Sequence, residues 1–190
     1  SPPVGPADDI DVDDVELVAR VLHDIDALTP VDEQERGSIE QFRSEVARLP
    51  RPFDERADPV HITGSAFIVG RRGIVLLLHR RLGIWVQPGG HVDPGEAPWD
   101  GARREAIEET GLPVEFLGGR IELAHVDVHA GGRGHTHLDL RYLFEAGDAD
   151  PTPPPEESQD VRWVAWADAP GLAEPGMAGV LDALAARFGA

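Results

Sequence analysis

The chain of 190 residues contains neither cysteine nor lysine, and each absence limits what the protein can do. Without cysteine it can form no disulfide bond, no cysteine-ligated zinc site and no thiol nucleophile, which fits a reducing cytoplasm. The longest aliphatic run, IVLLL at 74–78, is far too short to span a membrane. The acidic N-terminus lacks the apolar segment of a secretory signal peptide. We therefore expect a cytoplasmic protein without a membrane partner.

Arginine supplies all 17 basic side chains against 35 acidic ones, and the formal net charge is −18. Such a chain repels nucleic-acid phosphates over most of its surface, so we expect no nucleic-acid partner. A small anionic ligand can still bind where cations or local arginines reverse the field. Elsewhere the excess of acidic side chains is typical of a surface that favours solubility.

The first third of the chain differs from the rest in its predicted secondary structure. Residues 1–9 predict a disordered tail, and apolar residues at helical spacing predict helices over 10–28 and 32–49. The apolar faces of these helices need a partner, because a segment of this length cannot bury them alone. We expect them to pack in cis across the remainder of the chain and leave a homodimer open. We accordingly divide the chain into a helical extension, 1–58, and a domain, 59–190.

From Pro59 onward, short β-branched segments are separated by turns. The expected strands are 61–69, 73–80, 113–118, 121–130, 136–145 and 161–166, and the expected helices are 98–110 and 177–188. The Gly- and Pro-rich segments 81–96 and 151–157 predict loops. Because this order is not a regular βαβ alternation, it predicts an α+β fold, or an α/β/α sandwich, with a mixed sheet.

The helix expected at 98–110 carries three glutamates near its C-terminal end, within REAIEETG at 104–111. Glu105 lies three and four residues before Glu108 and Glu109, so like charges face one another. The helix dipole also disfavours anions at this end. Either these side chains form a solvated face, or they bind a hard divalent cation such as Mg²⁺, which prefers carboxylate oxygens. The helix by itself leaves both interpretations open.

The residues around this helix extend the pattern. Gly90 is followed after five residues by Glu96, and seven more residues lead to Arg104 and Glu105. The pattern then continues through Ala106, Glu108, Glu109, Gly111 and Leu112. This spacing resembles the signature box of the Nudix hydrolases at every fixed position, and the resemblance covers roughly 59–190. It implies a Nudix fold and the hydrolysis of a nucleoside diphosphate linked to another group, X, in a small anionic substrate.

The resemblance also implies roles for individual residues of the box. The metal ligands for Mg²⁺, or Mn²⁺, would be Glu105, Glu108 and Glu109, joined by the carbonyl of Gly89. Glu96 would assist through a water or the metal. Arg104 would orient the glutamates through a bidentate contact rather than touch substrate. The metal would neutralise phosphate charge and lower the pKa of the attacking water.

Two further segments, HVDVH at 125–129 and HTHLD at 135–139, each place their polar side chains on one face of a strand. Both sets share a face only if cross-strand partners have numbers of equal parity, and pairing His129 with His135 achieves this with a five-residue loop. The face is either solvated or lines the pyrophosphate site; zinc is a weaker alternative. The candidate substrate contacts are Arg80, Trp85, His91, His135, His137 and Asp139.

Two other functions stay open. One is a prenyl diphosphate isomerase-like enzyme of the same fold, although such isomerases usually use a cysteine and this chain has none. The other is a ligand-binding regulator that has lost catalysis, although such proteins usually have a damaged box. Markers associated with ADP-ribose, dinucleoside polyphosphate and NADH hydrolases have no match after the box. The group X therefore stays undetermined at this level.

Overall fold

The computed structural model describes residues 12–189, so the tail expected at 1–9 lies outside the described residues. The helices are α1 (Val12–Asp26), α2 (Glu33–Arg48), α3 (Pro98–Thr110), α4 (Ala169–Leu172) and α5 (Ala178–Phe188). The strands are β1 (Val60–Gly70), β2 (Gly73–Leu78), β3 (Trp85–Val86), β4 (Gly89–His91), β5 (Glu115–Phe116), β6 (Leu123–Ala130), β7 (Thr136–Glu145) and β8 (Val161–Val164). None of these described helices has the length and apolar character of a membrane span.

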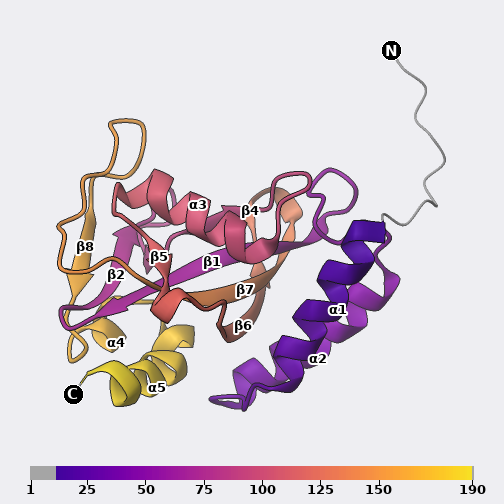
Figure 1. Cartoon of the computed structure of the whole chain (residues 1–190), viewed down its shortest axis with the longest axis horizontal. Coiled ribbons are helices and arrows are strands. Elements are labelled where there is room, and N and C mark those ends of the chain that lie inside the picture. The colour runs from indigo at the N-terminus through magenta and orange to yellow at the C-terminus, as the bar shows by residue number, and fades with distance from the viewer. Residues whose placement is uncertain (1–11, 190) are drawn as a thin grey trace.

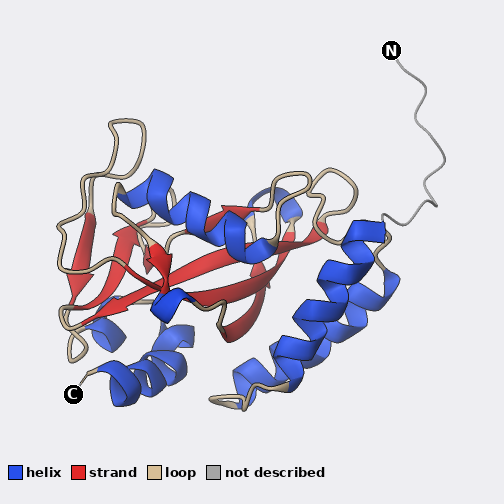
Figure 2. Ribbon diagram, viewed as in Figure 1, coloured by secondary structure: helices blue, strands red, loops and turns tan. Residues whose placement is uncertain are grey.

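Strand β1 organises the sheet. It pairs in parallel with β7 and antiparallel with β2 and β4, while β6 pairs with β7 and β8 pairs with β2. The sheet is therefore mixed, which confirms the α+β expectation. Figure 1 shows α3 over one face of the sheet, α5 toward the other, and α1 and α2 side by side at one end. The same layers stand out by element type in Figure 2.

Two expectations about strands need correction. The segment 81–96, expected as loop, contains β3 and β4, and β4 is a strand only because it pairs with the centre of β1. The strand expected at 113–118 is reduced to β5, because a 3₁₀ turn with left-handed glycines begins at Leu117. Both differences depend on tertiary pairing or on a turn, which local β-propensity does not report.

The helical extension shares its core with the sheet. Val21, Ile25 and Phe42 of α1 and α2 are buried in one apolar cluster with Ile62 and Leu140 of the sheet. The expectation that the extension packs in cis is thereby confirmed. On the same face, α3 approaches β1 very closely, because Gly64 has no side chain: a Cβ there would lie 2.4 Å from the carbonyl oxygen of Pro98.

Helix α2 also protects the free edge of β6. The Glu35 carboxylate accepts the backbone N–H of Val126 at 2.9 Å, and the Ser38 hydroxyl accepts that of Val128 at 3.1 Å. An unpaired strand edge invites association with another chain, and covering it with a helix removes that liability. The extension therefore completes the sheet instead of being a separate appendage.

The β6–β7 hairpin has the expected parity but a different register. His129 pairs with His137 and Ala130 with Thr136, so the pairing of His129 with His135 is wrong. The turn instead spans 131–135, where Arg133 and Gly134 adopt left-handed conformations, at φ 60° and 76°. Since the parity is kept, the two polar sets do share one face, as expected.

Candidate active site and metal ligands

The ends of α3 place the glutamates where they can act. Pro98 occupies the first turn, where a missing N–H costs nothing, and Gly111 ends the helix in a left-handed conformation at φ 68°. A Cβ at Gly111 would lie 2.2 Å from the carbonyl oxygen of Thr152, so space as well as conformation requires glycine. This stop leaves Glu105 and Glu109 on the last turns, facing β4.

Two glycines in β4 allow a close approach to these carboxyl groups. A Cβ at Gly90 would lie 2.7 Å from the carboxyl carbon of Glu105. The N–H of Gly89 donates to Glu109 at 3.2 Å, and a Cβ at Gly89 would collide with Ser65 at 2.3 Å. Side chains at either position would push β4 away from α3 or from β1.

The carboxyl groups of Glu105 and Glu109 face one another in a partly desolvated space. Burial, followed by the charge of Glu105, raises the pKa of Glu109 to about 9. Burial likewise raises the pKa of Glu105, against the opposing effect of Arg104. Glu108 differs, because 53% of its side chain is exposed and it reaches toward Arg104. Facing carboxyl oxygens are the donor set of a hard divalent cation, so the residues fit Mg²⁺ or Mn²⁺.

Arg104 connects the loop before α3 to the glutamates. Its guanidinium makes a bidentate contact with Glu96 at 2.9 and 3.1 Å. It also donates to Glu105 at 3.0 Å and to the carbonyl of His91 at 3.0 Å. These contacts place Arg104 between the loop residue Glu96 and Glu105 of the helix. The bidentate partner is Glu96.

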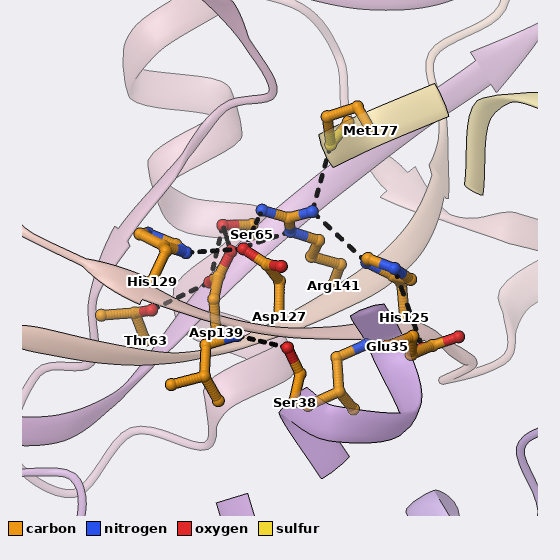
Figure 3. Close-up of polar contacts among 12 residues, drawn as sticks. Glu35, Ser38, Thr63, Ser65, His125, Asp127, His129, Asp139, Arg141 and Met177 are labelled. Atoms are coloured by element: carbon orange, nitrogen blue, oxygen red, sulfur yellow. Dashed lines mark hydrogen bonds and ion pairs between the residues drawn. The ribbon is translucent and has the colours of Figure 1, made fainter. Parts of the chain in front are cut away.

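The polar side chains on the shared face of β6 and β7 contact one another (Figure 3). One expectation for this face was a solvated surface. Arg141 donates to Asp139 at 3.0 Å, to Asp127 at 3.2 Å and to His125 at 3.3 Å. Asp139 also accepts the hydroxyls of Thr63 and Ser65 and is only 1% exposed. The interpretation of Asp139 as a substrate contact is therefore corrected: its carboxylate is enclosed and partnered inside the protein.

Histidines gather at the open end of this face. The ring of His61 in β1 lies 5.2 Å from that of His91, 5.3 Å from that of His135 and 5.1 Å from that of His137, between centroids. The structure thus brings three of the proposed substrate contacts together around a residue that the sequence analysis missed. The alternation of His61, Thr63 and Ser65 in one strand was the available signal.

The other two candidate contacts have protein partners. Arg80 donates to the backbone carbonyls of Glu156 and Glu157, which fixes the loop expected at 151–157 against β2. The ring of half-buried Trp85 lies under the guanidinium of Arg162, 4.5 Å from it. One face of Trp85 is thus occupied by a cation–π contact rather than open to a base.

A cleft of about 1120 Å³ opens beside the loop between β4 and α3, residues 92–97, here called the box loop. Its walls come from α1, from the segment 51–56 and from the segment 91–100. His91 and Glu96 lie on one wall, and Arg20, Arg51 and Arg56 are the basic residues of the lining. The helical extension therefore forms part of the cleft that Glu96 lines.

This fold, with a glutamate-bearing helix packed against the glycine residues of β4, defines a Nudix-type domain. Residues 59–184 match the NUDIX domain family, and the chain belongs to that family.

The chain is 39% identical over 97 residues to "Putative 8-oxo-dGTP diphosphatase 3" of Mycobacterium tuberculosis, covering 48% of this chain and 44% of that protein. It is 32% identical over 119 residues to the isopentenyl-diphosphate Delta-isomerase of Streptomyces griseus, covering 57% and 59%. A NUDIX-family hydrolase structure from Clostridium perfringens superposes with a TM-score of 0.57 at 27% identity, covering 65% of this chain and 97% of that one. The chain thus spans about half the length of these two curated relatives.

Proposed function

We propose that this protein is a metal-dependent pyrophosphohydrolase that cleaves a diphosphate bond in a small nucleotide-like substrate by attack of water on phosphorus. The observation that carries the proposal is the convergence of Glu105 and Glu109 on the Gly89–Gly90 strand, with Arg104 holding the surrounding carboxylates. Membership of the NUDIX family supports it. The intact box argues against a regulator that has lost catalysis.

The cation would be held by Glu105, Glu108 and Glu109, with the carbonyl of Gly89 and assistance from Glu96. Mg²⁺ or Mn²⁺ there supplies positive charge to the substrate's phosphates and lowers the pKa of a water nucleophile. The protein's own contribution is preorganisation. Arg104 keeps the carboxylates of Glu96 and Glu105 from rotating away, and the missing side chains in β4 let this strand lie directly against Glu105 and Ser65.

The cleft beside the box loop is the place we assign to the group X. Its wall carries His91 and Glu96, and Arg104 connects both residues to Glu105. Arg20, Arg51 and Arg56 share this lining with eight acidic residues, so an anionic substrate would need a bound cation to offset the negative field there. The likeness to the mycobacterial protein, named for 8-oxo-dGTP, favours a nucleoside triphosphate or a derivative among the candidates.

A substrate panel tests the proposal. Purified protein is incubated with Mg²⁺ and nucleoside triphosphates, dinucleoside polyphosphates, nucleotide sugars, ADP-ribose or isopentenyl diphosphate, and products are separated by ion-exchange chromatography. We expect cation-dependent cleavage of at least one nucleotide, lost in Glu109→Gln and kept in Glu40→Gln, whose carboxylate is exposed on α2. Folded protein that cleaves none of these substrates with Mg²⁺ or Mn²⁺ would contradict it.

A prenyl diphosphate isomerase is the second candidate, favoured by the 32% identity to the Streptomyces enzyme. The complete absence of cysteine argues against it, because isomerases of this kind usually use one. The isopentenyl diphosphate sample separates the two functions. An isomerase returns a diphosphate with a moved double bond, whereas a hydrolase returns phosphate.

A further inference from the structure

We propose that His61, His91 and His137 form a second metal site, for a transition-metal dication such as Zn²⁺. This site goes beyond the proposed hydrolase function, because it uses nitrogen donors and does not include the glutamates. Among the described residues, these three histidines are the set whose ligand atoms all lie within 4.8 Å of one another.

The burial of His61 is the strongest observation in favour of this site. It is 0% exposed, and neither of its ring nitrogens has a hydrogen-bond partner of ordinary geometry. The backbone of Asp58 is near enough to influence its pKa but makes no such bond. A buried polar atom without a partner costs roughly 1–3 kcal/mol, so native proteins seldom retain one without a purpose. A bound metal ion would satisfy one of these nitrogens.

The sheet delivers the three imidazoles to one place. His61 and His137 are direct cross-strand partners in β1 and β7, and His91 of β4 pairs with Thr63, two residues along β1. Ring centroids are 5.1 Å apart for His61 and His137 and 5.6 Å apart for His91 and His137. Around a tetrahedral Zn²⁺ with bonds of about 2.1 Å, ligand nitrogens are roughly 3.4 Å apart. Small ring rotations that move the nitrogens by on the order of 1 Å would therefore bring all three within bonding distance of one ion.

The surroundings of the three histidines favour metal binding. The Glu55 carboxylate lies 2.9 Å from Nε2 of His91, an arrangement in which an outer carboxylate orients a ligand through its other nitrogen.

The site is separate from the carboxylate cluster but connected to it. Successive residues of β4 point to opposite faces, so Gly90 faces Glu105 while His91 faces the histidines. The carbonyl of His91 accepts a hydrogen bond from Arg104 at 3.0 Å, which links both sites through one backbone segment. His91 and Glu55 also line the cleft, so an ion has a route from solvent. Nitrogen donors select Zn²⁺, Co²⁺, Ni²⁺ or Cu²⁺ over Mg²⁺.

The test is a Co²⁺ titration followed by visible absorption, with millimolar Mg²⁺ present to occupy the carboxylates. We expect one equivalent of Co²⁺ to give the absorption bands of a low-coordinate nitrogen site, and Zn²⁺ to displace it. His91→Ala should weaken Co²⁺ binding by at least roughly 100-fold, as removal of a direct ligand exceeds the loss of an outer partner. His23→Ala, on the exposed side of α1, is the matched control and should bind like the wild type.

His91 has a partly exposed side chain, so its replacement leaves the core intact, and circular dichroism verifies the fold of each variant. His61→Asn and His137→Asn should lose the bands as well. Wild-type protein without such bands overturns the proposal. So does a folded His91→Ala variant that binds Co²⁺ normally, or loss of the bands in Glu109→Gln but not in His91→Ala, since either result places the ion elsewhere.

Discussion

Arg104 is the residue on which the geometry of the glutamates depends. Its five donors are shared among Glu96, Glu105, Glu108 and the carbonyl of His91, and lysine could not reproduce this planar arrangement. The resemblance of the box to the family signature is what implied an orienting role for Arg104. His61 and Arg141 could not be inferred so directly, since their partners come from strands about 76 and 16 residues away.

Replacement of single glutamates tests the site at this scale. We expect Glu108→Gln and Glu109→Gln each to lower turnover by orders of magnitude, since the loss of a ligand charge weakens the cation that supports the chemistry. Glu109→Gln should also leave the metal-free melting temperature unchanged or higher, because it removes a buried carboxyl group whose pKa is raised. Turnover and melting temperature are measured with and without Mg²⁺. Near-wild-type turnover in either variant would show that its carboxylate is not needed.

The buried His125 predicts how stability responds to acid. Burial, and then Arg141, lowers its pKa to about 4, against about 6.5 when unfolded. The unfolded chain therefore takes up the proton first, so this contribution to stability is present above pH 6.5 and is lost as pH falls toward 4. The loss is on the order of 3 kcal/mol. His125→Gln should flatten the decline in unfolding free energy between pH 6.5 and 4, whereas His23→Gln should not; equal slopes would contradict the assignment.

At the scale of elements, the edge of β6 shows what a strand requires besides its own sequence. Its alternation of polar and apolar residues predicted the strand and the shared polar face. His129 pairs with His137 instead of His135 because the turn at Arg133 and Gly134 decides which residues pair. The short strand β4 escaped prediction for a related reason: three residues of Gly-Gly-His carry no β-propensity and become a strand only beside β1.

Removing the α2 side chains from that edge should destabilise the fold. Glu35 is buried and accepts the N–H groups of both Val31 and Val126. Glu35→Ala leaves both donors without a partner, at a cost of about 1–3 kcal/mol for each. Val31 and Val126 donate to different carboxylate oxygens, so Glu35→Gln keeps an acceptor for only one of them; it should cost less than Glu35→Ala but still destabilise. Urea unfolding of both variants, with Glu40→Ala as the exposed control, measures this. Equal losses for Ala and Gln would argue that packing, not hydrogen bonding, matters there.

At the scale of the whole molecule, the described part of the extension and the NUDIX domain share one hydrophobic core. The sequence correctly predicted two amphipathic helices and their packing in cis, because an apolar face must be covered. It could not indicate that α2 would complete the sheet edge or that α1 would wall the cleft, since both depend on how the helices dock.

Deletion of residues 1–50 is therefore expected to be severe. The segment buries Val21, Ile25, Ile39, Phe42, Val46 and Leu49. At roughly 1.5–3 kcal/mol for each side chain, their loss rivals the stability of a typical domain, about 5–15 kcal/mol. We expect an aggregated or unfolded product, while Val15→Ala, at an exposed position, stays near the wild type. Light scattering of the full chain reports whether it forms the homodimer left open above. A soluble truncation with full activity and an unchanged oligomeric state would show the extension to be dispensable.

The central claim is attack of water on phosphorus, and isotope transfer from solvent tests it most directly. The protein is incubated with Mg²⁺ and the best nucleotide of the panel in water enriched in oxygen-18, and the products are weighed by mass spectrometry. We predict that one labelled oxygen enters a phosphate-bearing product for each bond broken, and that Glu109→Gln forms little labelled product. Turnover that leaves the diphosphate bond intact, or products without solvent oxygen on phosphorus, would contradict the account.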